Sequence, residues 1–344
     1  MEVDRTEEGP TYRITNSSII KLSSCTYDLS SPREWLEYYE SIGTQGAYTV
    51  VRCDYILNNG RWRIWGEEFH LNRLAASFKK LQTLPGIRNQ TDEDAFDEIY
   101  TTSKEVMELL LQEAAILPSN DEAGRRDEKL FYTVMTTLLW QPEGDYINVR
   151  GHTYSTFKTS GFEEYTPEPL KVSIALTSKV ENMRPNRFEN LPEAKLSSWC
   201  RRRRPLEKRF KPTGVDDVIL TRFVEGEEVL LLEGLTSNLF AVFPNRTLRT
   251  PDTDFVLGGY ARYLVLEFAE RCGLKVEIGP LRLADSSLWN ELFLTSSVRL
   301  IVPVQELLTY NDSTKERELL WSERQSKATA VWQRLHDELC KNAL

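Results

Sequence analysis

The stretch from Val229 to Val242 combines an apolar strand pattern with one acidic residue. It reads VLLLEGLTSNLFAV, so Glu233 ends an apolar run and is followed by a glycine, small polar residues and Asn238. Burying an isolated carboxylate is very costly in free energy, so this side chain must lie in a cleft or face a cation. Glu233 is therefore a candidate for chemistry.

Two later segments could bind an anion. Thr250-Pro251 leads into LGGYAR (residues 257–262), which directly precedes a predicted helix. A glycine-rich entry leaves backbone N–H groups and the positive end of the helix dipole available, which suits a phosphate. The other segment, LFLTSSVRLIVPV (292–304), places Ser296 and Ser297 at the end of an apolar strand, where their hydroxyls could donate to the same anion.

The elements that must position these residues fall into two halves. In the first half the patterns predict a hairpin, two amphipathic helices and two further strands. The predicted hairpin strands are Ala47 to Leu57 and Arg61 to Trp65 around Asn58-Asn59-Gly60, the helices are Glu67 to Leu81 and Thr91 to Leu117, and the further strands are Leu130 to Trp140 and Tyr146 to Val149. Ser119 to Asp127 has the composition of an exposed loop, and the first 45 or so residues show no clear pattern.

The second half begins after a predicted junction near Thr153–Pro169. Strands are predicted over Lys171 to Leu176, Asp217 to Phe223, Glu228 to Leu232, Asn238 to Phe243 and Lys275 to Ile278, with helices over Gly259 to Cys272 and Glu318 to Leu339. The order is not a regular βαβ alternation, so we expect an α+β (mixed α/β) protein with two unequal sheets. The expected domains are residues 1–160 and 168–344.

Composition excludes several function classes. The chain has 344 residues, with 43 basic and 52 acidic side chains, a net charge of −9. An acidic balance argues against nucleic acid as the main partner, and no apolar run approaches the ~20 residues of a membrane span. The acidic N-terminus resembles neither a secretory signal nor a transit peptide, and the five scattered cysteines form no CxxC pair. These features predict a cytoplasmic protein without a metal site.

Taken in order, these motifs resemble the class IV aminotransferases, the fold-type-IV pyridoxal phosphate enzymes. That family includes branched-chain and D-amino-acid aminotransferases and aminodeoxychorismate lyase. The shared positions here are Glu233-Gly234, Asn238, Phe240, Thr250-Pro251, Leu257, Gly259, Arg262, Ser297 and Pro303-Val304. The resemblance implies a two-domain D-amino-acid aminotransferase-like fold with pyridoxal 5'-phosphate between the domains, and a homodimer.

The first half adds to the resemblance. AYTVVR (47–52) and FHLNRLAAS (69–77) look like the family's first strand and its His-x-x-Arg-Leu-x-x-Ser helix. By resemblance, Arg73 contacts the cofactor phosphate, where a guanidinium can bind two oxygens at once. Tyr48 matches a position on the substrate side of the cofactor, with a half-buried strand tyrosine as the alternative. His70 is expected to have a structural role, bonding backbone near the helix.

The cofactor also needs a lysine for its Schiff base, and Lys195 is the best match. It lies 38 residues before Glu233 (233 − 195), slightly more than family members usually show. By resemblance, Lys195 bonds the cofactor and then moves a proton, while Glu233 sits against the pyridine nitrogen. The phosphate would be fixed by backbone N–H groups at Gly259, Tyr260 and Ala261, by Ser296 and Ser297, and by Arg73.

The segment after the lysine departs from better-known members. Cys200 stands where branched-chain members often have tyrosine, and four arginines (201–204) precede Pro205, which should break a helix. The arginine run could be a solvated helix end or an anion contact. This Ala-Lys-x-Ser-x-Trp pattern with a basic run is nearest to a little-studied group seen in plants and fungi.

Substrate recognition leaves alternatives open. Arg150 ends a strand where relatives place a carboxylate-binding arginine, and a surface strand-end arginine is equally compatible with the pattern. The threonine that lyase members use falls on Val50, with Thr49 one place off and expected on the other face, which disfavours the lyase reaction. We therefore expect an aminotransferase acting on an amino acid and a 2-oxo acid. The alternatives are a pyruvate-eliminating lyase and a non-catalytic relative that binds no cofactor.

Overall fold

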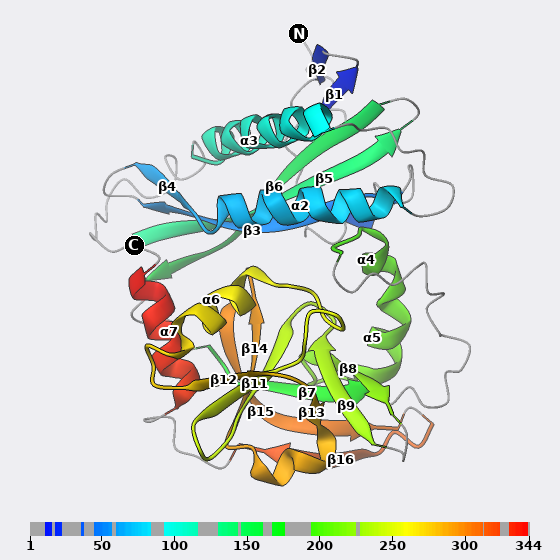
Figure 1. Cartoon of the computed structure of the whole chain (residues 1–344), viewed down its shortest axis with the longest axis vertical. Helices are drawn as coiled ribbons and strands as arrows, with labels where there is room; N and C mark the ends of the chain where they lie inside the picture. The colour runs from blue at the N-terminus through cyan, green and yellow to red at the C-terminus, as the bar shows by residue number, and fades with distance from the viewer. Residues whose placement is uncertain are drawn as a thin grey trace. The chain divides into compact units, whose positions relative to one another are not determined.

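The computed structural model describes thirteen segments of the chain. They are residues 11–15, 18–22, 36–37, 45–56, 60–83, 93–115, 130–143, 146–160, 167–175, 194–224, 228–311, 313–323 and 330–342. The predicted turn at Asn58-Asn59, the predicted loop Ser119 to Asp127 and Cys25 lie outside these segments. The chain divides into two compact units: Met1–Tyr165 with Ala194–Arg201, and Thr166–Glu193 with Arg202–Leu344 (Figure 1). The sequence prediction placed Lys195 in the second half, whereas this division groups its segment with the first unit.

The first unit is built on an antiparallel six-stranded sheet in the order β2-β1-β6-β5-β3-β4. The strands are β1 (Thr11–Thr15), β2 (Ser18–Leu22), β3 (Ala47–Ile56), β4 (Arg61–Ile64), β5 (Leu130–Glu143) and β6 (Tyr146–Ser160). The predicted hairpin is confirmed, since β3 pairs with β4. Strand β6 runs to Ser160, through the start of the predicted domain junction, because its whole length pairs with β5.

Two helices, α2 (Glu67–Gln82) and α3 (Glu93–Ala115), pack on this sheet (Figure 1). Leu71, Leu74, Phe78 and Leu81 recur at helical spacing along α2 and are fully buried in one core with Trp140 of β5. Gly151 lets α3 pack closely on β6, because a Cβ there would lie 2.6 Å from side-chain methyl groups of both Val106 and Leu110. The helices therefore cover one face of the sheet, and the residues that alternate with this core point to the other.

The second unit contains a ten-stranded sheet that closes into a barrel. Its order is β12-β11-β10-β14-β15-β7-β8-β9-β13, with β16 on β15. Strands β9 and β10 also pair with each other through Glu233 and Asn238, so β10, β14, β15, β7, β8 and β9 form a ring. The strands are β7 (Leu170–Ala175), β8 (Asp217–Phe223), β9 (Val229–Gly234), β10 (Asn238–Val242), β11 (Thr247–Thr250), β12 (Lys275–Ile278), β13 (Leu281–Arg282), β14 (Glu291–Ser296), β15 (Leu300–Tyr310) and β16 (Arg317–Ser322).

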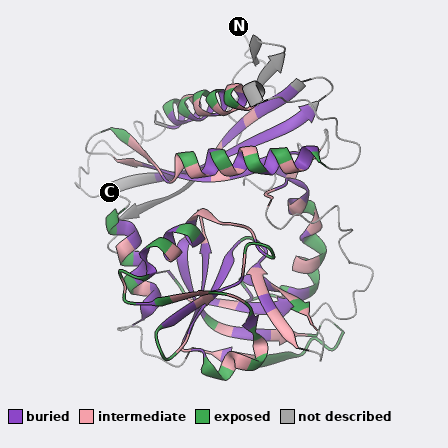
Figure 2. Cartoon of the chain, viewed as in Figure 1, coloured by how far each residue is buried: buried purple, intermediate pink, exposed green. Residues whose placement is uncertain are grey.

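The ring encloses an apolar core that Figure 2 shows as buried strands. Its largest members are Trp289 and Trp321, which pack with aliphatic residues of the ring strands. Around this unit lie α5 (Arg204–Phe210), α6 (Tyr260–Ala269), the 3₁₀ helix η4 (Leu283–Leu288) and α7 (Val331–Asn342). The helix predicted over Gly259 to Cys272 ends earlier, at Ala269, and the chain turns through Gly273, whose φ of 70° glycine adopts without strain.

One predicted element is wrong. The sequence predicts a single helix from Glu318 to Leu339, but residues 317–322 form β16 and helix α7 begins only at Val331. Glutamate and leucine favour a helix, yet pairing with β15 and burial of Trp321 outweigh that propensity. The helix start is set by the buried Glu291, whose carboxylate accepts the N–H groups of Val331 and Trp332 at 2.8 and 3.1 Å.

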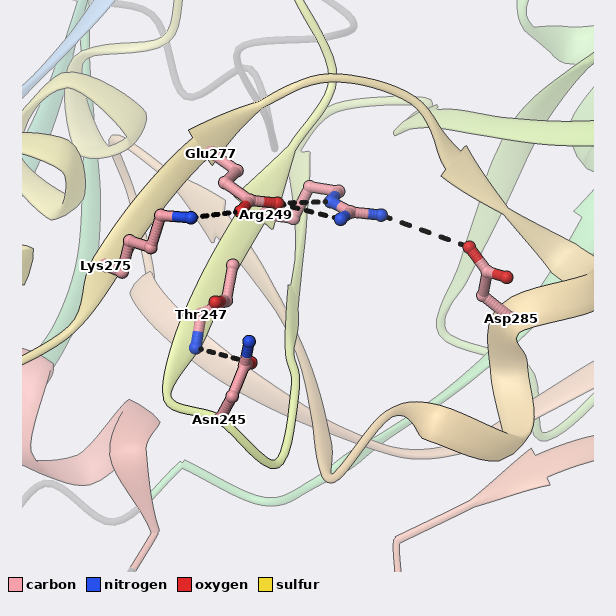
Figure 3. Close-up of polar contacts among 6 residues, drawn as sticks. All are labelled: Asn245, Thr247, Arg249, Lys275, Glu277 and Asp285. Atoms are coloured by element: carbon pink, nitrogen blue, oxygen red, sulfur yellow. Dashed lines mark hydrogen bonds and ion pairs between the residues drawn. The ribbon is translucent and has the colours of Figure 1, made fainter.

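Strand β12 lies at the open edge of this sheet, parallel to β11, and carries charged side chains (Figure 3). Arg249 of β11 donates two hydrogen bonds to Glu277 at 2.8 and 3.2 Å, and Lys275 binds the same carboxylate at 2.8 Å. The bonds from Lys275 and Arg249 lower the pKa of Glu277. Charged side chains on an edge strand discourage pairing with a second sheet. This cluster therefore protects β12, the last strand in the order, from pairing with a strand of another molecule.

Candidate active site

The Lys195 segment is attached to the start of β3 in the first unit by backbone hydrogen bonds. Tyr48 N–H donates to the Lys195 carbonyl at 2.9 Å, and Ser197 N–H donates to the Gly46 carbonyl at 2.8 Å. Ala47 and Leu196 form the antiparallel bridge between these bonds. A third bond fixes the lysine from α2, because Lys195 N–H donates to the buried Ser77 Oγ at 3.1 Å. The lysine backbone is thus held by both a strand and a helix.

The amine of Lys195 lies against Tyr48. Lys195 Nζ is 4.8 Å from the centre of the Tyr48 ring, within cation–π range. The tyrosine side chain is 5% exposed and packs with Leu139 and Cys200. The structure therefore brings together the predicted Schiff-base lysine and the predicted substrate-side tyrosine, with Cys200 as an apolar neighbour of the tyrosine.

One face of α2 carries three polar residues at helical spacing: His70, Arg73 and Ser77. Arg73 Nη2 lies 3.1 Å from both Thr49 Oγ1 and His70 Nδ1. Burial lowers the pKa of Arg73 to about 10, with Tyr48 acting in the opposite direction. The predicted phosphate contact is therefore a half-buried cation that shares its helix face with the residue anchoring Lys195.

Tyr48 and Arg150 share the sheet face that α2 and α3 do not cover. Both are register partners of Leu139, from the two strands that flank β5. Arg150 Nη1 donates to the buried Gln141 Oε1 at 2.6 Å, which fixes the guanidinium along the strands. Thr49 bonds His70 of α2 and so faces the opposite side, as predicted, while Val50 packs with the Tyr48 cluster.

In the second unit, Glu233 is held by two donors. Asn238 Nδ2 and the Leu257 N–H reach Glu233 Oε2 at 3.1 and 3.0 Å. Asn238 Nδ2 also donates to the Leu257 carbonyl at 2.7 Å. The carboxylate predicted from the strand pattern thus sits half-buried at the point where the barrel closes, and the same bonds bring the Leu257 segment to this end.

The glycine-rich entry to α6 follows from there. Gly259 is the residue before the helix, and a Cβ on it would lie 2.2 Å from Asn238 Oδ1, so any side chain there would displace the Asn238 amide. Tyr260 and Ala261 form the first turn, where backbone N–H groups lack carbonyl partners within the helix. Burial, with Glu267 and Tyr263, raises the pKa of Tyr260 to about 12, which keeps its phenol protonated.

Arg262, one of the positions that carry the family resemblance, binds a backbone carbonyl. Arg262 is 7% exposed, and its Nη2 donates to the Pro251 carbonyl at 2.9 Å. Burial lowers its pKa, while Asp252 and Glu233 oppose that shift. Arg262 therefore links the Thr250-Pro251 motif to α6.

The predicted serines lie at the end of β14. Asn238 of β10 is the register partner of Thr295, and Ser296 is the last residue of the strand. Ser296 Oγ accepts the Arg299 N–H at 3.2 Å across the turn that contains Ser297. Helix α6 packs against β14. The structure thus gathers Glu233, the α6 entry and the serine turn at one end of the second unit.

Sequence reasoning missed the buried Asp217 beside this end. Its carboxylate accepts bonds from the Val218 N–H at 2.8 Å, the Leu235 N–H at 3.2 Å and Ser237 Oγ at 2.8 Å. These bonds hold the connection between β9 and β10, which carries Glu233 and Asn238 at its two ends. An acidic residue opening a strand that is otherwise apolar, DVIL, is the signal that could have found it.

The arginine run divides between surface and core. Helix α4 (Ser198–Arg202) ends before Pro205, as the proline predicts, and α5 starts again at Arg204. Arg203, at 8% exposure, pairs with Glu207 at 3.3 Å, whereas Arg201 and Arg204 are exposed. One of the four arginines is thus a buried structural residue.

Neither a metal site nor a membrane-spanning helix is present in the described part of the chain. No group of three histidine, cysteine or carboxylate side chains there is arranged to hold a metal ion. None of its helices combines the length and apolarity that crossing a bilayer requires.

The chain matches known proteins over most of its length. Residues 46–307 match the amino-transferase class IV family. A protein of Methanocaldococcus jannaschii assigned as a branched-chain-amino-acid aminotransferase is 35% identical over 95 residues, which are 27% of this chain and 31% of that protein. This chain thus matches less than a third of that relative's length.

Solved structures show the same fold. The branched-chain amino acid aminotransferase from Thermobaculum terrenum in its PLP form superposes with a TM-score of 0.57 and 18% identity, covering 98% of this chain and 94% of that one. A fold IV-transaminase from Curtobacterium pusillum gives a TM-score of 0.55 and 18% identity, covering 96% of this chain and 98% of that one. At these identities the likeness is one of fold.

Proposed function

Because the chain belongs to the class IV aminotransferase family, we propose that it is a pyridoxal-phosphate-dependent aminotransferase that moves an amino group between an amino acid and a 2-oxo acid. The observation that carries the proposal is Lys195 Nζ lying 4.8 Å from the Tyr48 ring, with the lysine backbone tied to β3 and α2. A lysine held in this way supports covalent attachment of a cofactor aldehyde.

The residues present fit this cofactor. Gly259 precedes α6, a helix whose first backbone N–H groups suit a phosphate. Glu233 is a half-buried carboxylate oriented by Asn238 and Leu257, as a partner for a pyridine N–H should be. Arg73 supplies a half-buried cation for the phosphate.

When bound, pyridoxal phosphate supplies a ring that accepts the electron pair left at the substrate's α-carbon. Lys195 would hold the cofactor and, once released by the substrate, carry the proton to and from that carbon. Glu233 would accept a hydrogen bond from the ring N–H and keep that nitrogen protonated. Arg73, the N–H groups at Gly259, Tyr260 and Ala261, and Ser296 with Ser297 would bind phosphate oxygens. Tyr48 and Arg150 would orient the substrate carboxylate.

Absorbance spectroscopy of the wild type and Lys195→Ala with added pyridoxal phosphate tests this proposal. We expect a band near ~420 nm, the region typical of this cofactor bonded to a lysine amine. The band should be lost in the variant and change when an amino acid is added. A band that survives in Lys195→Ala means another lysine holds the cofactor, and no band in either folded protein favours a non-catalytic relative.

The product formed distinguishes transfer from elimination. The aminotransferase proposal expects a new amino acid only when a 2-oxo acid acceptor is present. The lyase alternative expects pyruvate without any acceptor, and Val50 rather than threonine on the Tyr48 face supports transfer.

We also propose that the protein forms a homodimer and is located in the cytoplasm. The four cysteines in the described segments, Cys53, Cys200, Cys272 and Cys340, form no disulfide, which fits a reducing compartment. Sedimentation equilibrium should give twice the chain mass of 39.9 kDa, and fractionation of cells should recover the protein with cytosolic markers.

A further inference from the structure

The guanidinium of Arg73 is oriented from three sides. Its Cζ lies 5.4 Å from the centre of the Phe69 ring, four residues earlier on α2. Its Nη2 is 3.1 Å from His70 Nδ1, three residues earlier, and 3.1 Å from Thr49 Oγ1 on the neighbouring strand. The helical spacing and the strand register together fix the plane of the group.

The contact with Arg73 assigns His70 Nδ1 as a hydrogen-bond acceptor. A guanidinium can only donate, so the bond from Arg73 requires a lone pair on Nδ1 and places the ring proton on Nε2. The Thr49 hydroxyl, 2.8 Å from Nδ1, then donates to it and accepts from Arg73. Burial lowers the pKa of His70 well below its usual range, and the nearby Arg73 and Lys195 lower it further, so the ring is neutral.

We propose that His70 and Thr49 are positioning residues that orient the Arg73 guanidinium for a phosphate. The inference rests on the proposed function, because it requires Arg73 to bind the cofactor phosphate. A guanidinium recognises phosphate through a planar fork, so the orientation of its plane decides how well it binds. Two neutral acceptors fix that plane without cancelling its charge, which a carboxylate partner would do.

Matched variants test the two residues with two probes, pyridoxal phosphate and pyridoxal. Pyridoxal has the same aldehyde and ring but lacks the phosphate. His70→Leu and Thr49→Val remove the acceptors, whereas His70→Asn and Thr49→Ser keep an acceptor near the same place. Dissociation constants come from quenching of tryptophan fluorescence, and circular dichroism of each protein without cofactor checks folding.

We expect His70→Leu and Thr49→Val to weaken pyridoxal phosphate binding by about tenfold, the usual scale for one hydrogen bond to a charged group. Pyridoxal binding should change less than about twofold, because no phosphate is involved. His70→Asn and Thr49→Ser should bind pyridoxal phosphate nearly as the wild type does. A loss of general structure would instead weaken both probes equally.

A double variant shows whether the effect passes through Arg73. In an Arg73→Gln protein, adding Thr49→Val should cause no further loss of pyridoxal phosphate affinity, because the group to be positioned is gone. The inference is overturned if His70→Leu and Thr49→Val leave the ratio of the two dissociation constants unchanged in a protein that shows the Lys195-dependent band. A wild type that binds neither probe overturns the proposed function as well. If His70→Leu fails to fold, the comparison of Thr49→Val with Thr49→Ser tests the inference, because both side chains are close to threonine in size.

Discussion

Glu233 and Asn238 are linked twice, once through backbone and once through side chains. As register partners they join β9 to β10 and close the barrel of the second unit. Asn238 Nδ2 then donates to Glu233 Oε2 at 3.1 Å. The residue pair that completes the fold is therefore also the pair that orients the candidate catalytic carboxylate.

Substitution of adjacent glycines tests the packing against this pair. In Gly259→Ala the new Cβ would lie 2.2 Å from Asn238 Oδ1 and displace the amide that holds Glu233. We expect stability to fall by about 1–3 kcal/mol, the scale of overpacking, and cofactor affinity to fall with it. Gly258→Ala is the matched control, since among the described residues its Cβ would meet Thr253 Cγ2 alone, at an ordinary contact distance of 3.8 Å. Equal behaviour of the two variants in urea unfolding and cofactor titration would contradict the expectation.

A second prediction concerns the packing of the connection between β9 and β10. A Cβ on Gly234 would lie 2.2 Å from Ser237 Oγ and 2.7 Å from Asp217 Oδ2, the two groups that hold this connection. Gly234→Ala should lower the free energy of unfolding by about 1–3 kcal/mol. For comparison, a Cβ on Gly279 would meet no atom of the described residues within 4 Å, so Gly279→Ala should stay within about 0.5 kcal/mol of wild type. Denaturant unfolding measures the free energy of unfolding of both variants, and equal values would contradict the prediction.

Arg150 should bind substrate rather than stabilise the fold. Removing a bidentate partner of a carboxylate costs about 1.5–3 kcal/mol, so Arg150→Gln should reduce kcat/KM by about 10- to 150-fold. The change should appear mainly in KM, and Arg150→Lys should recover part of the loss because it keeps the charge. Steady-state kinetics with an amino acid and a 2-oxo acid measure it. Unchanged kcat/KM in Arg150→Gln would place the substrate carboxylate elsewhere.

Burial of neutral His70 predicts a pH dependence of stability. Its pKa is lowered in the folded protein, so below about pH 6.5 the unfolded chain binds a proton that the folded protein does not. The free energy of unfolding should therefore fall as the pH drops from about 6.5, by at most about 1.4 kcal/mol per pH unit from this group.

The difference between wild type and His70→Asn isolates that contribution. Other histidines titrate in both proteins, so they cancel. Unfolding followed from pH 8 to pH 5 should show the wild type losing more stability than the variant. Parallel curves would mean that His70 is protonated in the folded protein as readily as in the unfolded chain.

The strands that carry the candidate site could be located from the sequence, because each ends in a short motif. Asp217–Phe223 and Lys275–Ile278 match the structure at both ends, and the strands carrying Glu233 and Asn238 differ from their predictions by one or two residues. Alternating apolar residues bounded by glycine and small polar residues determine such strands locally. Composition alone could not show that Glu233 and Asn238 are register partners.

The errors have a common physical origin in long-range contacts. Residues 317–322 have helical propensity but pair with β15, whose sequence lies on the other side of a turn. Asp217 gave little signal because its three donors include groups 18 and 20 residues away. The structural role expected for His70 includes contacts of its Nδ1 with the Thr49 and Arg73 side chains, which lie on two elements and so could not be read from the local sequence.

The attachment of residues 194–201 to the first unit has a consequence for synthesis. Gly46 and Tyr48 obtain backbone partners from Lys195 and Ser197, about 150 positions later in the chain. A ribosome adds roughly 5–20 residues per second. The residues that pair with the start of β3 are therefore made many seconds after β3 itself. In the sequence, residues 194–201 stand between β7 and β8, which both belong to the second unit. The first unit can therefore be completed only after Thr166–Glu193, the first part of the second unit, has been made.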